Sequence, residues 1–275
     1  SQAEVFEVAS FYHHFEVVKE GADGKVPVAP AITVRVCDGL ACELAGAPDL
    51  LSRLTALLGG EVRVMPAPCV GRCDTAPAVV VHQFVVHQCA VPNATPQAVV
   101  DALSAGRTTD VVPGHVDLDA YVAQGGYRLL QQCHGGQRNA ESVIRALEDA
   151  GLRGLGGAGF PAGRKWRVVR EQPAPRLLAV NADEGEPGTF KDRWLLERDP
   201  HRFLEGVFVA AWAVGVEKVF IYLRDEYHGC RALLQRELDG LRAQPPVSGL
   251  PAVELRRGAG AYVCGEESAM IESIE

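Results

Sequence analysis

Four of the eight cysteines stand in two pairs whose spacing suits a metal centre. Cys37 and Cys42 form a C-x4-C pair, and Cys69 and Cys73 form a C-x3-C pair. Thiolates are soft ligands for zinc or iron–sulfur clusters, and a [2Fe-2S] cluster takes four of them, two on each iron. Structural zinc sites usually contain a tighter two-residue spacing. The pattern therefore favours a [2Fe-2S] cluster, with zinc, inert thiols and disulfides as the alternatives.

Glycines crowd a second segment, residues 151–163 (GLRGLGGAGFPAG), which holds six of them in thirteen positions. A loop of this kind lets backbone amides approach a phosphate without interference from side chains. Such loops also serve as structural connectors, and the G-x-G-x-x-G pattern matches by chance. The segment alone is compatible with both interpretations.

Acidic and amide side chains gather in residues 181–192 (NADEGEPGTFKD), just after an expected strand. Loops at strand ends are common ligand sites, and these groups suit the hydroxyls of a ribose or ribityl chain. A solvated acidic turn or a helix cap is the alternative. A third segment, residues 257–268 (RGAGAYVCGEES), adds glycines, an aromatic ring and two adjacent acids. The three segments together indicate a nucleotide or flavin site.

The elements that must position these residues fall into two groups. In the first, β-branched and apolar patterns predict strands at residues 32–37, 61–64, 78–82 and 84–87, and helices at residues 50–58 and 95–104. Thr95 opens the second helix with Pro96 at its first position. The order βαβββα predicts a small α/β domain.

The second group follows a polar, turn-rich stretch at residues 105–115, which marks the best domain boundary. Helices are expected at residues 118–122, 140–150 and 203–214, and strands at residues 176–180 and 218–223. The predicted domains are therefore residues 1–110 and 111–275.

The composition limits the classes of function. The 275 residues are 47% hydrophobic and carry a net charge of −8 with no long basic block, so nucleic acid is not an expected partner. The longest apolar run, residues 206–216, is shorter than the ~20 residues that span a bilayer, and no secretory signal can be read at the start of the sequence. We expect no membrane insertion and a cytoplasmic location. The chain starts at Ser1 and stops at Glu275 within a pattern, so we expect both ends to be incomplete.

The cysteine segments resemble a known family. VCDGLAC followed by APCVGRCDTAPAVVV is similar to the thioredoxin-like [2Fe-2S] ferredoxin domain in the family of 24-kDa complex I subunits. The resemblance implies that the two cysteine pairs are the cluster ligands. The remaining cysteines lack a second paired spacing and are expected to be small buried hydrophobes: Cys89, Cys133, Cys230 and Cys264.

The three later segments resemble a second family. GLRGLGGAGFPAGRKW, NADEGEPGTFKDR and GAGAYVCGEESAMIESIE are similar to the family of FMN- and NADH-binding 51-kDa complex I subunits, over about residues 140–275. The resemblance implies a flavin phosphate cradle at Gly154, Gly156, Gly157 and Gly159 with Lys165 nearby. It implies contacts to the ribityl chain and ring edge at Asn181, Asp183 and Glu184, and a cofactor cleft lined by Tyr262, Gly265, Glu266 and Glu267. Phe160 would stack on the NADH adenine, or else pack beside Trp166, and Glu186 would lie beside the nicotinamide as the catalytic-site acid.

The expected fold class is thus α/β, a thioredoxin-like [2Fe-2S] ferredoxin domain followed by a truncated FMN- and NADH-binding domain. The resemblance implies hydride transfer between NAD(H) and FMN and single-electron transfer between FMN and iron–sulfur clusters. A [4Fe-4S] cluster would belong to the missing C-terminal part.

The fusion resembles the β subunits of soluble NAD-dependent molybdenum or tungsten formate dehydrogenases, which implies an iron–sulfur and molybdopterin partner subunit. The alternatives are the diaphorase subunit of an NAD-reducing hydrogenase, a complex I-type NADH–quinone oxidoreductase, and, from a different class, a nonenzymatic iron–sulfur electron carrier.

Overall fold

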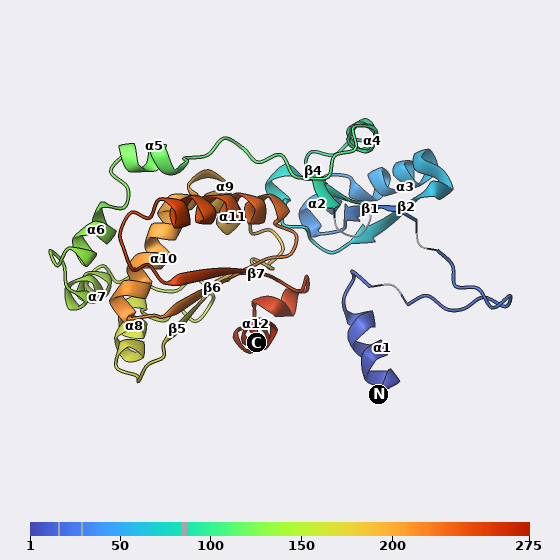
Figure 1. Ribbon diagram of the computed structural model, residues 1–275. Helices are drawn as coiled ribbons and strands as arrows, with labels where there is room; N and C mark the ends of the chain where they lie inside the picture. The colour runs from blue at the N-terminus through green and yellow to red at the C-terminus, as the bar shows by residue number, and fades with distance from the viewer. Residues whose placement is uncertain (16, 29, 84–86) are drawn as a thin grey trace.

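The computed structural model describes residues 1–15, 17–28, 30–83 and 87–275 (Figure 1). After helix α1 (Gln2–Phe11), the first domain forms a four-stranded sheet in the order β2-β1-β3-β4. The central strand β1 (Ile32–Cys37) runs parallel to β2 (Val62–Ala67) and antiparallel to β3 (Val79–Gln83), which pairs with β4 (His87–Val91). Three of the four expected strands are confirmed. The fourth was expected at residues 84–87, of which 84–86 lie outside the described residues.

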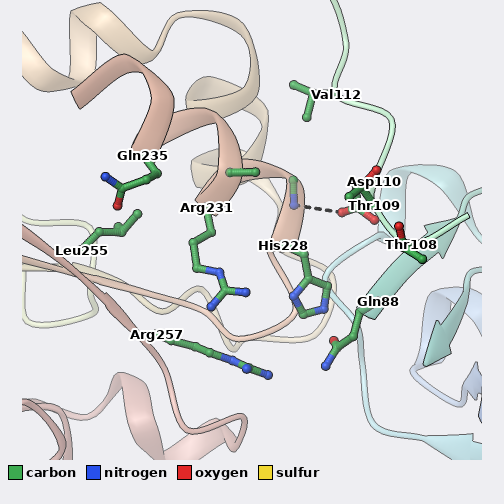
Figure 2. A pocket seen from close by; sticks show the side chains of 12 residues that line it. Gln88, Thr108, Thr109, Asp110, Val112, His228, Arg231, Gln235, Leu255 and Arg257 are labelled. Carbon is green, nitrogen blue, oxygen red and sulfur yellow. Dashed lines mark hydrogen bonds between the residues drawn. The ribbon is translucent and has the colours of Figure 1, made fainter. Parts of the chain in front are cut away.

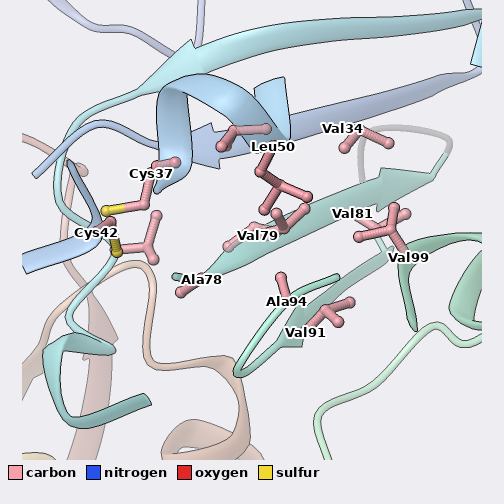
Figure 3. Close-up of a cluster of buried hydrophobic side chains, with 14 of the residues drawn as sticks. Val34, Cys37, Cys42, Leu50, Ala78, Val79, Val81, Val91, Ala94 and Val99 are labelled. Atoms are coloured by element: carbon pink, nitrogen blue, oxygen red, sulfur yellow. The ribbon is translucent and has the colours of Figure 1, made fainter. Parts of the chain in front are cut away.

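Helices α2 (Leu40–Leu44), α3 (Ala47–Leu58) and α4 (Pro96–Ser104) complete this domain. In α3, Leu50 and Leu54 are one helical turn apart and both are buried against the sheet. The Thr95 hydroxyl accepts a hydrogen bond of 3.1 Å from the Ala98 amide, so α4 begins as predicted from its cap. Valines from β1 and β3 form the core with these helices, and the Cys37 and Cys42 sulfur atoms lie together at its edge (Figure 3).

The second domain is built on a three-stranded parallel sheet in the order β5-β6-β7, namely Leu177–Ala182, Lys218–Leu223 and Ala252–Arg257. Because side chains alternate along a strand, β6 serves two cores. Its Val219 and Ile221 belong to the core shared with α10 (Pro200–Val214) and α11 (His228–Ala243), while Tyr222 packs against Met270 of α12 (Glu267–Ile274). The helices α11 and α12 thus lie on opposite sides of the sheet (Figure 1).

The remaining helices of this half are α5 (Leu118–Ala123), α6 (Arg128–His134), α7 (Ala140–Asp149), α8 (Ala162–Arg170) and α9 (Lys191–Arg198). Short 3-10 turns occur at Gly59–Glu61, Cys73–Thr75 and Tyr262–Gly265. Among the helices that the described residues form, none has the length and apolar character of a membrane span.

The segment between α4 and α5, residues 105–117, forms neither helix nor strand. Asp110 fixes its middle to both halves. One carboxylate oxygen accepts from the Ala90 amide at 2.7 Å, and the other accepts from Arg72 at 2.9 Å and from the Gly229 amide at 3.1 Å. We propose this segment, near residue 110, as the boundary between the two domains.

Candidate functional site

The four paired cysteines come together at one end of the first domain. Cys37 ends β1, Cys42 lies in α2, and Cys69 and Cys73 lie in the loop after β2, with their sulfur atoms 3.5 Å apart. Gly39 permits this approach, because a Cβ atom there would lie 3.2 Å from Cys69 Cβ and 3.5 Å from Cys37 Sγ. The loops therefore bring the two predicted pairs to one place.

The pKa values of these thiols depend on their contacts with one another. The pKa of Cys37 is raised, chiefly by its contact with Cys42 and less by burial. The pKa of Cys69 is raised in the same way by its contact with Cys37 and by burial. The pKa of Cys42 is lowered by its contact with Cys37. Crowded thiolates repel one another, so a cationic centre between them is the group that they fit. Among the described residues, no three His, Cys, Asp or Glu side chains converge on a single ion position. A [2Fe-2S] cluster takes four thiolates, two on each iron.

The other four cysteines lie elsewhere. Cys89, Cys133, Cys230 and Cys264 are all buried, and three of them belong to hydrophobic cores with apolar neighbours. This burial agrees with the expectation that they are small hydrophobes.

Two of the expected cofactor segments meet where the parallel strands end. Asn181 lies at the end of β5, Asp183 follows that strand directly, and Gly265 ends the 3-10 turn that follows β7. The Asn181 amide donates to the Gly265 carbonyl at 2.8 Å, and its own oxygen accepts from the Asp183 amide at 3.1 Å. A Cβ atom on Gly265 would lie 2.8 Å from the Asp183 carbonyl oxygen, so this close approach requires glycine. The carboxyl edge of a parallel sheet is a common ligand site.

Asp183 leaves an unpaired group at this edge. Its Oδ2 is buried and has no hydrogen-bond partner among the described residues, and burial, with the Glu226 charge, raises the pKa of the Asp183 carboxyl to about 7. A buried oxygen without a donor is costly. A ligand hydroxyl could donate to this oxygen, and the hydroxyls of the expected ribityl chain are groups of that kind.

Two of the expected acids serve as helix caps. The Glu184 carboxylate accepts from the backbone amides of Asp192 at 3.1 Å and Arg193 at 3.3 Å, at the start of α9. The Glu266 carboxylate accepts from the Ser268 and Ala269 amides at the start of α12. The favourable end of the helix dipole explains both positions. The alternative interpretation of the acidic segment as a helix cap thus holds for the Glu184 carboxylate.

The outer acids face solvent. Glu186 is exposed and accepts a hydrogen bond of 2.6 Å from the hydroxyl of Tyr262, whose side chain is 67% exposed. Glu267 is also exposed, in the first turn of α12. The contact between Glu186 and Tyr262 joins the loop after β5 to the loop after β7 and places a carboxylate and a ring at an accessible edge.

The glycine loop precedes α8 and is held by its own backbone. The Gly154 amide donates to the Phe160 carbonyl at 3.0 Å, and Arg153 donates to the Gly159 carbonyl at 3.0 Å. Gly157 has φ +100° and Gly159 has φ +59°, conformations that favour glycine.

This loop has the free donors that a phosphate needs. Within the described chain, the amides of Gly156, Gly157 and Gly159 donate to no protein acceptor, and a Cβ atom at any of the three would meet nothing within 4 Å. Open amides before a helix N-terminus suit an anion. Phe160 is 48% exposed and Lys165 is exposed, so both are accessible to a ligand.

Sequence reasoning missed a set of buried arginines between the two domains. Arg193, in α9, donates to the Gly71 carbonyl at 3.0 Å, to Glu197 at 2.9 Å and to Asp74. Arg72 donates to Glu197 at 3.2 Å as well as to Asp110. These contacts fasten the loop of Cys69 and Cys73 to the second domain. The contacts between this loop and α9 join residues more than a hundred positions apart in the sequence, so no local pattern signals them.

A cavity of about 510 Å³ lies between α11 and the segment of residues 105–117 that connects α4 to α5 (Figure 2). His228, Arg231 and Arg257 line one side of it, and Gln88 and Asp110 line the other. None of the expected cofactor residues lines this cavity, so we do not assign the flavin to it.

Two families match separate parts of the chain. Residues 1–104 match the thioredoxin-like [2Fe-2S] ferredoxin family, and residues 147–275 match the Nuo51 FMN-binding domain family. These matches confirm the expected fold class, and they support FMN, NAD(H) and a [2Fe-2S] cluster as the cofactors.

Named relatives cover different shares of the chain. An NADH-quinone oxidoreductase subunit of Rhizobium meliloti is 42% identical over 181 residues, 62% of this chain and 42% of the relative. The alpha subunit of the NAD-reducing hydrogenase HoxS of Cupriavidus necator is 32% identical over 100% of this chain and 50% of the relative. A crystal structure of an NAD+-reducing [NiFe]-hydrogenase in the H2-reduced state has 30% identity and a TM-score of 0.74, covering 100% of this chain and 49% of that one. The chain spans half or less of the length of these relatives.

Proposed function

We propose that this chain, a thioredoxin-like [2Fe-2S] domain followed by a Nuo51-type FMN-binding domain, is the NADH dehydrogenase (diaphorase) module of a multi-subunit redox complex. It would be an FMN-dependent NAD(H) oxidoreductase subunit that exchanges a hydride between NAD(H) and FMN and passes single electrons to a [2Fe-2S] cluster. The observation that carries the proposal is the buried Arg224 side chain, which donates to the carbonyls of both Cys69 and Glu184 and so joins the cysteine loop to the acidic loop.

Each group of residues has a defined task in this proposal. Bound FMN supplies the chemistry, since it takes electrons as a pair and releases them singly. The open amides of Gly156, Gly157 and Gly159 would hold its phosphate with help from Lys165, and Gly154 would shape the cradle through its bond to the Phe160 carbonyl. Hydride transfer needs aligned rings more than a general base, so we assign no catalytic triad.

The carboxyl edge of the sheet would hold the rest of the cofactors. Asn181, Asp183 and the backbone of Glu184 would face the ribityl chain and ring edge, and the loop of Tyr262, Gly265, Glu266 and Glu267 would close the cleft. Glu186, fixed by the Tyr262 hydroxyl, would bring negative charge to the nicotinamide. Phe160 would offer its exposed ring to the adenine.

The cluster assignment is tested by analysis of the complete protein after anaerobic purification. Cys37, Cys42, Cys69 and Cys73 should bind two irons and two acid-labile sulfides, in accord with a four-thiolate [2Fe-2S] site. Changing Cys73 to serine should disturb the spectrum, whereas changing the buried Cys133 should not. Zinc without iron or sulfide would reject the assignment.

The flavin discriminates between an enzyme and a nonenzymatic electron carrier. Bound FMN with NADH–ferricyanide activity supports the enzyme, whereas a protein that keeps the cluster but lacks FMN is a carrier. We assign none of the cysteines of this chain to a [4Fe-4S] cluster, and the proposed compartment is the cytoplasm, in accord with eight cysteines that form no disulfide.

Two partner subunits are candidates. The fusion of both domains in one chain suggests the diaphorase subunit of an NAD-dependent formate dehydrogenase with a molybdopterin partner. The similarity to the HoxS alpha subunit over the whole chain favours an NAD-reducing hydrogenase instead, and the relatives from NADH-quinone oxidoreductases match only part of the chain. Copurified partners and methyl-viologen reduction by formate or by hydrogen decide between the two.

A further inference from the structure

One arginine touches the backbone of both proposed cofactor sites. Arg224 follows β6 and is only 6% exposed. One of its terminal nitrogens donates to the Cys69 carbonyl and the other to the Glu184 carbonyl, while its Nε donates to Glu226 at 2.9 Å. A single planar guanidinium therefore connects a proposed cluster ligand to the proposed flavin loop.

The surroundings hold this guanidinium in place. Tyr227 is fully buried, its ring lies 5.5 Å from the Arg224 guanidinium carbon, and its hydroxyl donates to the Glu184 carboxylate at 2.8 Å. The same ring lies against Gly71 of the cysteine loop, where an added Cβ atom would be 2.5 Å from it. The Arg224 guanidinium, the Tyr227 ring, the cysteine loop and the acidic loop form one packed unit, because each of them contacts at least two of the others.

We propose that Arg224 is a positioning residue that holds the cluster loop against the flavin loop and whose buried charge raises the reduction potential of the cluster. This inference rests on the proposed function. Reduction adds one electron to the cluster, taken from reduced FMN, and neither forms nor breaks a bond. The negative charge of the site therefore increases by one, and a fixed cation at the Cys69 carbonyl stabilises the reduced state.

Different substitutions can separate the two proposed roles of Arg224, which are to hold the loops together and to supply positive charge. A lysine keeps the positive charge, but its compact ammonium group lacks the rigid planar geometry in which two separate guanidinium nitrogens each donate to one carbonyl. A methionine removes both the charge and the donors. Glu226 is the counter-charge of Arg224, so neutralising it should act on the cluster in the opposite direction to the loss of Arg224.

The test compares Arg224→Met, Arg224→Lys and Glu226→Gln in the complete protein with bound cofactors. The midpoint potential of the cluster is measured by redox titration with electron paramagnetic resonance detection, and deuterium uptake is measured at residues 68–74. Arg224→Met should lower the ratio of reduced to oxidised cluster at fixed potential about tenfold, which is about 59 mV for a one-electron couple. Arg224→Lys should stay near the wild-type potential but exchange deuterium faster in the loop, and Glu226→Gln should raise the potential.

Arg176→Met is the matched control. Arg224 donates to two backbone carbonyls, and Arg176 donates to three, those of Gly215, Arg170 and Gln172, none of which belongs to the cysteine loop. It should leave the cluster potential and the uptake at residues 68–74 unchanged.

Failure of the inference and failure of the proposed function give different results. A wild-type protein without a reducible [2Fe-2S] signal contradicts the proposed function. A wild-type signal together with an unchanged potential in Arg224→Met, or a shift equally large in Arg176→Met, overturns the inference. If Arg224→Met binds no cluster, Glu226→Gln decides, because an unchanged or lowered potential in that variant also overturns it.

Discussion

Gly71 lies in the cysteine loop against the Tyr227 ring of the second domain, and Gly71→Ala probes that contact. Gly71 has φ +70°, and a Cβ atom there would lie 2.5 Å from Cε1 and 3.0 Å from the hydroxyl oxygen of Tyr227. No real Cβ contact is that short, so either the loop or the ring must move. The ring has little freedom, because Tyr227 is fully buried and bonded to Glu184.

The expected cost has two parts. A left-handed conformation costs a residue with a Cβ atom about 1–2 kcal/mol. Forcing an extra methyl group into a packed site costs about a further 1–3 kcal/mol. We therefore expect Gly71→Ala to lower the free energy of unfolding by about 2–5 kcal/mol.

The control is Gly106→Ala. Gly106 has φ +59°, but a Cβ atom there meets nothing within 4 Å, so only the conformational part of about 1–2 kcal/mol applies. Urea unfolding of the two variants and of wild type gives the difference, with the slope as a check on two-state behaviour. A double variant that adds Tyr227→Leu to Gly71→Ala should recover part of the loss, since the clash disappears. Equal destabilisation by Gly71→Ala and Gly106→Ala, with no coupling to Tyr227, would refute the reasoning.

Three further predictions concern the cofactor pocket. Gly157→Asp should abolish FMN binding, because it puts a carboxylate among the open amides, whereas Gly151→Asp, also at positive φ but outside the cradle, should keep it; flavin fluorescence after release measures occupancy. Glu186→Gln should weaken NAD+ relative to NADH by about 1 kcal/mol, while Tyr262→Phe, which leaves the charge, should not; an unchanged ratio of dissociation constants leaves Glu186 an ordinary loop acid. Burial raises the pKa of Asp183 to about 7, so the folded protein keeps a proton that the unfolded chain loses, and the free energy of unfolding without FMN should fall by up to about 4 kcal/mol between about pH 4 and pH 7. Asp183→Asn should flatten this slope in urea titrations at each pH, and identical slopes would contradict the burial argument.

Local signals made several elements predictable. The strand β6, Lys218–Leu223, was predicted with its observed bounds, because its apolar run ends at charged residues. Helix α4 was predicted from Thr95 and Pro96 at its start. The strand β7, residues 252–257, was missed, because one glutamate and two arginines among six residues hide the alternation of Val253 and Leu255. This segment forms a strand because it pairs with β6 along its whole length.

The residues of the candidate site also fall into two groups, those with a local sequence signal and those that depend on distant contacts. The cysteine quartet was predictable, because each pair is a short local spacing, and the glycine and acidic segments are continuous in sequence. The role of the Glu184 side chain as a cap of α9 was open, since it depends on where that helix begins. Arg224 was missed because its contact with Cys69 spans 155 positions, and no local pattern encodes such a contact.

Residues 105–117, which Asp110 fixes to both halves, connect the two domains covalently. The noncovalent contact between the domains can therefore be weaker than a contact between separate chains. A short tether raises the effective concentration of one partner around the other into the millimolar range. A contact that would hold two separate chains with a Kd of about 1 μM then leaves roughly one molecule in a thousand open. Even a hundredfold weaker contact, a loss of about 2.8 kcal/mol, leaves roughly nine in ten molecules closed. We therefore expect this chain to tolerate substitutions that would separate two independent subunits with the same contact.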